Sequence, residues 1–146
     1  MDMSYVLVVD DDPVTLCLLD DLIGFHLPSV SVVTESSSVV AFERVKAHPY
    51  DVLIIDLAMP EMDGATLAAN LYHFNPLIPV ILISGGPLQG SPPLNMFAYL
   101  SKPIDCGSFI HIVNQAIEHR RFLHPSTCDC GDKLLRVTML PEGVRT

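Results

Sequence analysis

The segment YVLVVDDDP, residues 5–13, decides the fold. Its unbroken apolar run ends in three consecutive aspartates. Residues 52–55 form a second apolar run that ends at Asp56, and residues 79–83 form a third that ends at Ser84. Runs that are apolar at every position are typical of the central strands of a parallel sheet, where both faces are buried. Residues 31–34 and 98–100 are shorter strand candidates.

Helical patterns separate these strands. Apolar residues recur at helical spacing in residues 13–25, 38–47 and 64–74, and in a last segment that runs from Asp105 to about residue 122. Asp12, Asp63 and Asp105 stand where an N-cap belongs. Strands that alternate with helices predict an α/β fold, with right-handed crossovers and helices on both faces of a parallel sheet.

The stretch between Ser84 and Tyr99 departs from this alternation. It contains three prolines and three glycines, which work against a long helix. We expect a loop there, with at most one or two turns near residues 93–97. Residues 1–123 are expected to form one domain, followed by a C-terminal tail, residues 124–146, without a clear fold.

The composition limits the classes of partner. The 146 residues suffice for one domain, and 17 acidic residues against 8 Lys and Arg give a formal net charge of −9. A chain this acidic has no overall attraction for nucleic acid or anionic lipid, so direct nucleic-acid binding is not expected. The apolar runs are too short to span a bilayer, so membrane insertion is not expected either. Short apolar runs and the lack of a secretory signal pattern predict a cytoplasmic location. The four cysteines are expected to be reduced thiols.

Polar residues gather at the ends of the predicted strands. In an open parallel sheet, ligands bind beyond the carboxyl ends of the strands. The residues expected there are Asp10, Asp11, Asp12, Asp56, Ser84 and Lys102. Clustered carboxylates repel one another, and Mg²⁺ with its oxygen ligands relieves that repulsion. A carboxylate can also attack phosphorus, provided that a metal, an ammonium group and a hydroxyl neutralise the phosphoryl oxygens.

Five motifs in chain order resemble the receiver domains of bacterial two-component response regulators. They are VLVVDDDP (residues 6–13), DLAMP (56–60), MDG (62–64), SG (84–85) and YLSKP (99–103). The resemblance covers about residues 4–122. It implies a flavodoxin-like, doubly wound sheet of five parallel strands in the order 2-1-3-4-5, with the family's fourth helix shortened or replaced by a loop.

The resemblance also implies a phosphoacceptor and a metal site. Asp56 would accept the phosphoryl group and contribute to the Mg²⁺ site. Asp11 would bind the ion directly and Asp10 mainly through water, while Ala58 would offer its backbone carbonyl. The phosphoryl donor would be a histidine kinase or a histidine phosphotransfer protein. The resemblance implies no enzymatic activity apart from Mg²⁺-dependent self-phosphorylation and autodephosphorylation.

Three further residues take roles by the same resemblance. Lys102 would pair with Asp56 and then with the phosphoryl group. Ser84 would move to hydrogen-bond a phosphoryl oxygen, and Tyr99 would turn inward behind it. The resulting switch would change binding to a downstream protein, which the sequence does not name, and a homodimer is a further possible state.

The sequence departs from the family in two places. The segment between Ser84 and Tyr99 is shorter than is usual, which puts the usual dimer or output face in doubt. Ala58 and Gly86 are small where the family often carries longer polar side chains. Our hypothesis is that open access for water at these positions sets the lifetime of the phosphoryl group.

Three alternatives remain open at this stage. Residues 6–14 also resemble the first motif of haloacid-dehalogenase-type phosphohydrolases, with Asp10 as nucleophile and Asp12 as general acid. A second alternative is a receiver-like scaffold that works without phosphorylation. A third concerns the tail alone, where His124, Cys128 and Cys130 offer three ligands at unusual spacing, so a solvated tail is preferred to a zinc site.

Overall fold

Five parallel strands form the centre of the molecule. The computed structural model describes residues 3–123. The strands are β1 (Ser4–Val9), β2 (Val30–Glu35), β3 (Val52–Asp56), β4 (Val80–Ser84) and β5 (Met96–Ser101). Their order in the sheet is β2-β1-β3-β4-β5, and every neighbouring pair is parallel. The predicted flavodoxin-like order 2-1-3-4-5 is therefore confirmed.

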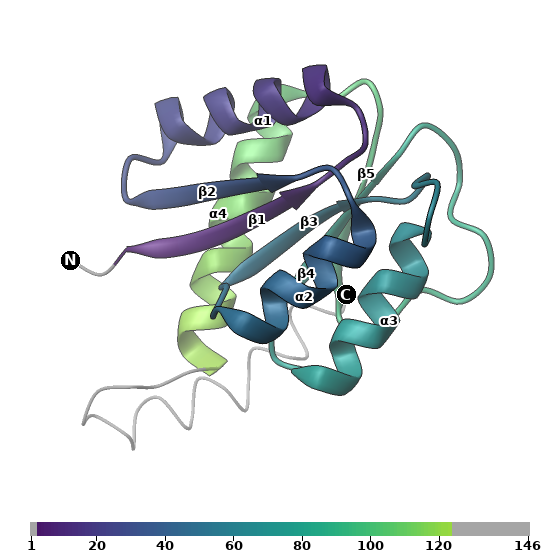
Figure 1. The fold of residues 1–146 in the computed structure, drawn as a ribbon. Coiled ribbons are helices and arrows are strands. Elements are labelled where there is room, and N and C mark those ends of the chain that lie inside the picture. Colours follow the sequence, from purple (N-terminus) through teal and green to yellow (C-terminus); the bar gives the residue numbers. More distant parts are fainter. Residues whose placement is uncertain (1–2, 124–146) are drawn as a thin grey trace.

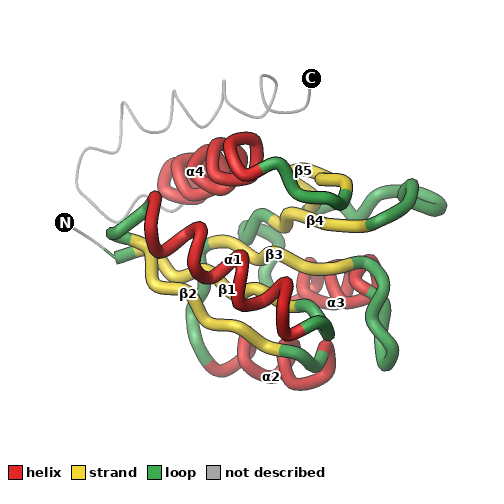
Figure 2. The backbone as a smooth tube through the Cα atoms, turned by 90° about the horizontal axis from the view of Figure 1, so that it is seen from above, coloured by secondary structure: helices red, strands yellow, loops and turns green. Residues whose placement is uncertain are grey.

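Helices cover both faces of this sheet. They are α1 (Pro13–His26), α2 (Ser38–Ala47), α3 (Gly64–Phe74) and α4 (Cys106–Leu123). In Figure 1, α2 and α3 lie in front of the sheet and α4 behind it. Figure 2 shows the same arrangement from above, with α4 on one side of the strands and α2 and α3 on the other. The doubly wound architecture expected from the alternating pattern is thus present.

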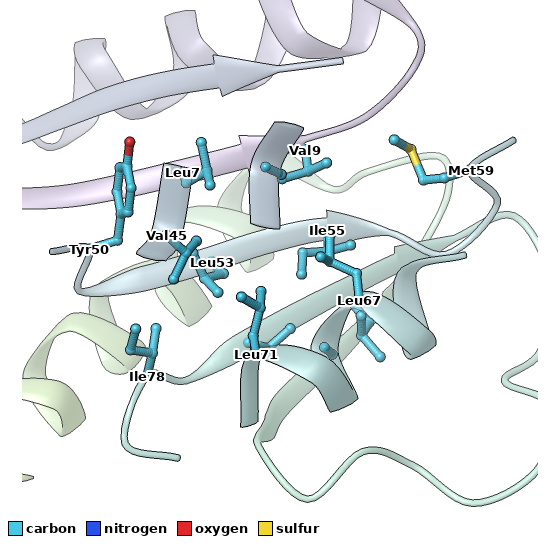
Figure 3. Packing of buried hydrophobic residues seen from close by; sticks show 14 residues of the cluster. Leu7, Val9, Val45, Tyr50, Leu53, Ile55, Met59, Leu67, Leu71 and Ile78 are labelled. Carbon is cyan, nitrogen blue, oxygen red and sulfur yellow. The ribbon is translucent and has the colours of Figure 1, made fainter. Parts of the chain in front are cut away.

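Successive residues of a strand point to opposite faces of the sheet and pack into two separate hydrophobic cores. Leu7 and Val9 of β1 join the core beneath α2 and α3, whereas Val6 and Val8 join the core beneath α1 and α4. Figure 3 shows the first core, in which side chains of β1 and β3 meet those of α3. Because β1 and β3 are apolar on both faces, they occupy the middle of the sheet, and their carboxyl ends lie side by side.

Aspartates and a serine start the first three helices. Asp12 accepts a hydrogen bond from the Val14 amide and Asp63 one from the Thr66 amide, while Ser37 caps α2. These side chains satisfy amides that the first helical turn leaves without partners. Asp105, the third predicted cap, accepts a hydrogen bond from the Ser108 amide at 2.9 Å, directly before α4.

A loop replaces a helix between β4 and β5, as the prolines and glycines predict. One turn is present, in which the Met96 amide donates to the Pro93 carbonyl at 3.1 Å. The strand predicted at residues 98–100 begins earlier, at Met96, because pairing with Val80 of β4 extends it. Asn95, which is 7% exposed, ties this connection to α3 by donating from Nδ2 to the Ala68 carbonyl at 2.9 Å.

Within residues 3–123, no helix is both long enough and apolar enough to cross a membrane. The expected tail, residues 124–146, and its candidate ligands His124, Cys128 and Cys130 lie outside the described residues.

Candidate functional site

Two buried carboxylates meet at the carboxyl end of the sheet. Asp10 directly follows β1 and is 2% exposed, and Asp56 is the last residue of β3 and is 4% exposed. The parallel register pairs Val9 with Ile55, so each carboxylate stands one residue beyond the same rung of the ladder. The sheet therefore fixes the spacing of two groups that repel each other when both are ionised.

Lys102 bridges these two carboxylates. Its Nζ lies 3.2 Å from Asp56 Oδ1 and 3.4 Å from Asp10 Oδ2. Lys102 directly follows β5, and its amide donates to the Ser84 carbonyl at 2.8 Å, which anchors its main chain to β4. The ammonium group expected beside Asp56 is thus in place.

The buried setting shifts all three ionisable groups. Burial raises the pKa of Asp56, and the neighbouring Asp10 carboxylate raises it further. Burial likewise raises the pKa of Asp10, although the Asp12 amide and Lys102 act in the opposite direction. For Lys102, burial lowers the pKa, but the Asp10 and Asp56 carboxylates outweigh that effect and the pKa is raised. Burial therefore outweighs the Lys102 ammonium group in setting the pKa of both carboxylates.

A third carboxylate completes an oxygen-only cluster. Oxygens of Asp10, Asp11 and Asp56 all lie within 4.8 Å of one another, and Asp11 is exposed. Hard carboxylate oxygens, one of them open to solvent, suit Mg²⁺, which keeps several waters and uses few protein ligands. Oδ1 of Asp10 already accepts the Asp12 amide at 2.9 Å. The donor set thus fits the ion that the sequence predicts.

The loop of residues 57–63, which carries Ala58, is held tightly at both ends. The Leu57 amide donates to the Ile83 carbonyl at 2.8 Å, and the Leu57 carbonyl accepts the Gly64 amide at 2.9 Å. A Cβ at position 64 would collide with the Asp56 carbonyl oxygen and would lie 2.9 Å from Leu57 Cα. Gly64 therefore lets α3 begin directly against the end of β3. Ala58 itself is exposed.

Ser84 and Tyr99 meet at one residue, Gly86. The Ser84 hydroxyl accepts the Gly86 amide at 3.1 Å, and the Tyr99 hydroxyl donates to the Gly86 carbonyl. In the part of the chain that the structure describes, the Ser84 hydroxyl therefore bonds Gly86 rather than Asp56 or Lys102. Tyr99 packs partly buried against the core beneath α2 and α3. The two predicted switch residues are thus linked, beside the carboxylates rather than among them.

Asp12 lies apart from the carboxylate cluster. It accepts hydrogen bonds from the Val14 amide at 3.2 Å and the Thr15 hydroxyl at 2.7 Å. The Thr15 hydroxyl, and then the Val14 amide, lower the pKa of Asp12. A general acid must hold its proton near neutral pH, so this environment does not favour the phosphohydrolase alternative.

Three residues near the site escaped the sequence reasoning. Glu35 ends β2, Ser37 caps α2, and the Ser37 hydroxyl donates to Glu61 Oε1 at 2.8 Å. The serine cluster at residues 36–38 signals a helix start, but nothing in the sequence indicates that this turn reaches the 57–63 loop. Two of the four cysteines, Cys17 and Cys106, fall within the described residues and are exposed free thiols.

Comparisons with known proteins agree with this geometry. The family model described as response regulator receiver domain matches residues 6–114. Transcriptional regulatory protein GlrR of Escherichia coli K12 is 34% identical over 124 residues, which are 79% of this chain and 26% of that protein. A protein-glutamate methylesterase/protein-glutamine glutaminase of Hahella chejuensis is 29% identical over 138 residues, covering 94% of this chain and 36% of that protein. The chain thus spans only about a quarter to a third of these relatives.

A solved structure gives the same result. The signal receiver domain of an HD domain-containing protein from Pseudomonas fluorescens has a TM-score of 0.75 at 26% identity, covering 82% of this chain and 98% of that one. None of these comparisons supports a haloacid-dehalogenase-type phosphohydrolase. This chain belongs to the response regulator receiver domain family and is a phosphorylatable signalling domain.

Proposed function

We propose that Asp56 is the phosphoacceptor of this domain and that a phosphohistidine on a histidine kinase or histidine phosphotransfer protein is the donor. One observation carries the proposal: the nearly buried Asp56 carboxylate has an ammonium group at 3.2 Å and two further carboxylates within 4.8 Å. Two other carboxylates at this edge, those of Asp10 and Asp12, accept main-chain amides. Asp10 accepts the Asp12 amide, and Asp12 caps α1.

The transfer is a substitution at phosphorus. An Asp56 oxygen attacks the phosphorus atom, the new P–O bond forms, and the P–N bond to histidine breaks. The histidine nitrogen keeps the electron pair of that bond and takes up a proton. Lys102 faces both Asp10 and Asp56, so its ammonium group can stay with Asp10 while it pairs with an oxygen of the phosphoryl group.

Asp10, Asp11, Asp56 and the carbonyl of Ala58 would hold Mg²⁺. When bound, the ion neutralises charge on the phosphoryl oxygens during transfer. Asp10 would act mainly through water, since one of its oxygens is already engaged by the Asp12 amide. Asp11, exposed at the rim, would bind directly.

Phosphorylation would be read out through Ser84 and Tyr99. The Ser84 hydroxyl would leave the Gly86 amide and donate to a phosphoryl oxygen. Without that hydrogen bond, Gly86 would be free to move. Because the Tyr99 hydroxyl donates to the Gly86 carbonyl, this movement would also release the Tyr99 ring, which would turn inward behind Ser84. The surface that changes would then bind a downstream protein or a second copy of the chain. This binding would take place in the cytoplasm and would not involve direct contact with nucleic acid.

The receiver domain in this proposal comprises residues 1–123, and residues 124–146 form a tail.

Mass spectrometry with a small phosphoryl donor tests this function. Incubation with acetyl phosphate and Mg²⁺ should add one phosphoryl group to the wild-type chain, located at Asp56 after reduction of the acyl phosphate. Asp56→Asn and removal of Mg²⁺ by a chelator should each abolish the label. A label at Asp10 instead would contradict the assignment and support the phosphohydrolase alternative.

The scaffold alternative needs its own comparison. A pull-down with and without a beryllofluoride mimic of the phosphoryl group identifies partners that depend on the switch. Partner affinity that is equal for the wild type and Asp56→Asn, with and without the mimic, would support a scaffold. A mimic-dependent change in the wild type alone would support the switch.

A further inference from the structure

The apex of the 57–63 loop, residues 60–61, lies at the surface between residues that main-chain hydrogen bonds or core packing hold. Main-chain hydrogen bonds hold its ends, through Leu57 and Gly64, and the Met59 amide donates to the Leu57 carbonyl at 3.2 Å, which closes a turn around Ala58. Between them, Met59 is 7% exposed and packs in the core, so the apolar part of the loop is also fixed. Ala58 and Glu61 are exposed and gain no such support from burial. The Ala58 carbonyl is therefore held by the turn at residues 57–59, and a shift of the apex would reach it through Met59.

A side-chain hydrogen bond ties this apex to the start of α2. The Ser37 hydroxyl donates to Glu61 Oε1 at 2.8 Å and accepts the Val40 amide at 3.2 Å. One hydroxyl thus caps a helix and holds a loop. The two connections it joins follow β2 and β3, which are not neighbours, because β1 lies between them in the sheet.

Ser37 is itself held rigidly. Glu35 accepts the amides of Ser36 and Ser37 on Oε2, both at 3.1 Å, and Arg44 Nε on Oε1 at 2.7 Å. The Glu35 carbonyl accepts the amide of Asp10 at 3.1 Å. A continuous path of hydrogen bonds therefore runs from Asp10, on one side of the carboxylate cluster, to Glu61, on the loop at the other side.

We propose that Glu61 is a positioning residue for the divalent-cation site: by accepting the Ser37 hydroxyl, it fixes the loop that presents the Ala58 carbonyl. Glu61 does not contact the ion in this account and acts through the loop alone. The inference rests on the proposed function, since it assigns a support to the proposed Mg²⁺ ligand. It adds a residue that the sequence motifs do not single out.

Mg²⁺ titration by calorimetry on the full 146-residue chain tests the proposal. Glu61→Ala removes the acceptor and should weaken Mg²⁺ binding about fivefold, the order expected for one net hydrogen bond. Glu61→Gln keeps an oxygen that accepts the Ser37 hydroxyl but loses the charge, and it should stay within about twofold of the wild type, as expected for an exposed charge. Without Mg²⁺, Glu61→Ala should lose no more than about 1 kcal/mol in the free energy of unfolding, the value of the same hydrogen bond, and Glu61→Gln should match the wild type.

Glu43→Ala is the matched control. Glu43 is an exposed carboxylate on α2 that pairs with Lys46 at 3.2 Å and has no part in the path to Asp10. Its removal should leave Mg²⁺ affinity unchanged. Equal affinity of Glu61→Ala and the wild type would overturn the proposal while leaving the proposed function intact. Equal weakening of Glu61→Ala and Glu61→Gln would also overturn it, because charge and not the hydrogen bond would be responsible. A wild-type chain that binds no Mg²⁺ would overturn both this inference and the metal site itself.

Discussion

Neutralising Asp56 should stabilise the metal-free domain. In Asp56→Asn the side chain keeps its shape and loses its charge, and Lys102 keeps Asp10 as its partner. At an effective dielectric constant of about 20, Coulomb's law gives about 5 kcal/mol of attraction from Lys102 at 3.2 Å. It gives about 3.5 kcal/mol of repulsion for a carboxylate at 4.8 Å, the outer limit of the cluster.

With both carboxylate neighbours counted, the repulsion of about 7 kcal/mol exceeds the attraction by about 2 kcal/mol. Asp11 and Lys102 are partly exposed, so solvent screens their contributions. The cost of burying an ionised carboxylate that is 4% exposed acts in the same direction, and it is also the main cause of the raised pKa of Asp56. We expect a gain of about 1–2 kcal/mol in the free energy of unfolding for Asp56→Asn, or roughly 3–8 °C in melting temperature.

Thermal unfolding with and without Mg²⁺ measures this effect. At 100 times its dissociation constant, Mg²⁺ should stabilise the wild type by about 2.7 kcal/mol, and it should stabilise Asp56→Asn much less. The order of stability should therefore reverse when Mg²⁺ is added. Asp20→Asn, which removes an exposed carboxylate on α1, is the control and should change neither curve. A metal-free Asp56→Asn protein that is less stable than the wild type would refute the electrostatic reasoning.

The remaining expectations concern pH, packing and water access. The pKa of Asp56 is raised above 3.8, so just above pH 3.8 the metal-free folded state binds more protons than the unfolded state. The wild type should therefore lose stability relative to Asp56→Asn as pH rises through that window. A difference in melting temperature between the two proteins that stays the same at all pH values would contradict this. Gly64→Ala should cost about 1–3 kcal/mol in urea unfolding because its Cβ meets main chain, whereas Gly24→Ala in α1, with open space around it, should be neutral or stabilising by up to about 1 kcal/mol. Arg120 is 7% exposed, and its Nε and one terminal nitrogen have no hydrogen-bond partner. Arg120→Met should therefore leave the free energy of unfolding unchanged or raise it by about 1 kcal/mol or more. A decrease of several kcal/mol would show instead that favourable contacts of the guanidinium offset the cost of burying it. Ala58→Met should slow hydrolysis of the phosphoryl group, as measured by the rate of phosphate release. An unchanged rate would contradict the hypothesis that open access for water sets the lifetime of this group.

The sequence predicted the sheet and the placement of the charged groups. The runs at residues 5–9, 52–55 and 79–83 are apolar at every position, so burial on both faces follows from composition alone. Once the strands are parallel, Asp10 and Asp56 must stand at the same edge. Loop composition also correctly predicted a loop in place of a long helix between Ser84 and Tyr99.

Contacts between loops could not be predicted in the same way. The hydrogen bond from Ser37 to Glu61 depends on how two connections approach each other in space, and no periodic pattern encodes that approach. Likewise, the pairing of Tyr99 with the Gly86 carbonyl follows from the local path of the chain after β4. The burial of Arg120 was also not anticipated, because apolar periodicity in the last helix identifies only its apolar inward positions.

The central claim is that Asp10, Asp11 and Asp56 share one divalent ion beside Lys102. A crystal structure of the domain with Mg²⁺ and beryllofluoride tests it most directly. The account predicts a fluoride-bearing group on Asp56, an ion among the three carboxylates and the Ala58 carbonyl, and Lys102 in contact with a fluorine. An Asp56 side chain that stays unmodified, or an ion bound elsewhere at saturating Mg²⁺, would contradict it.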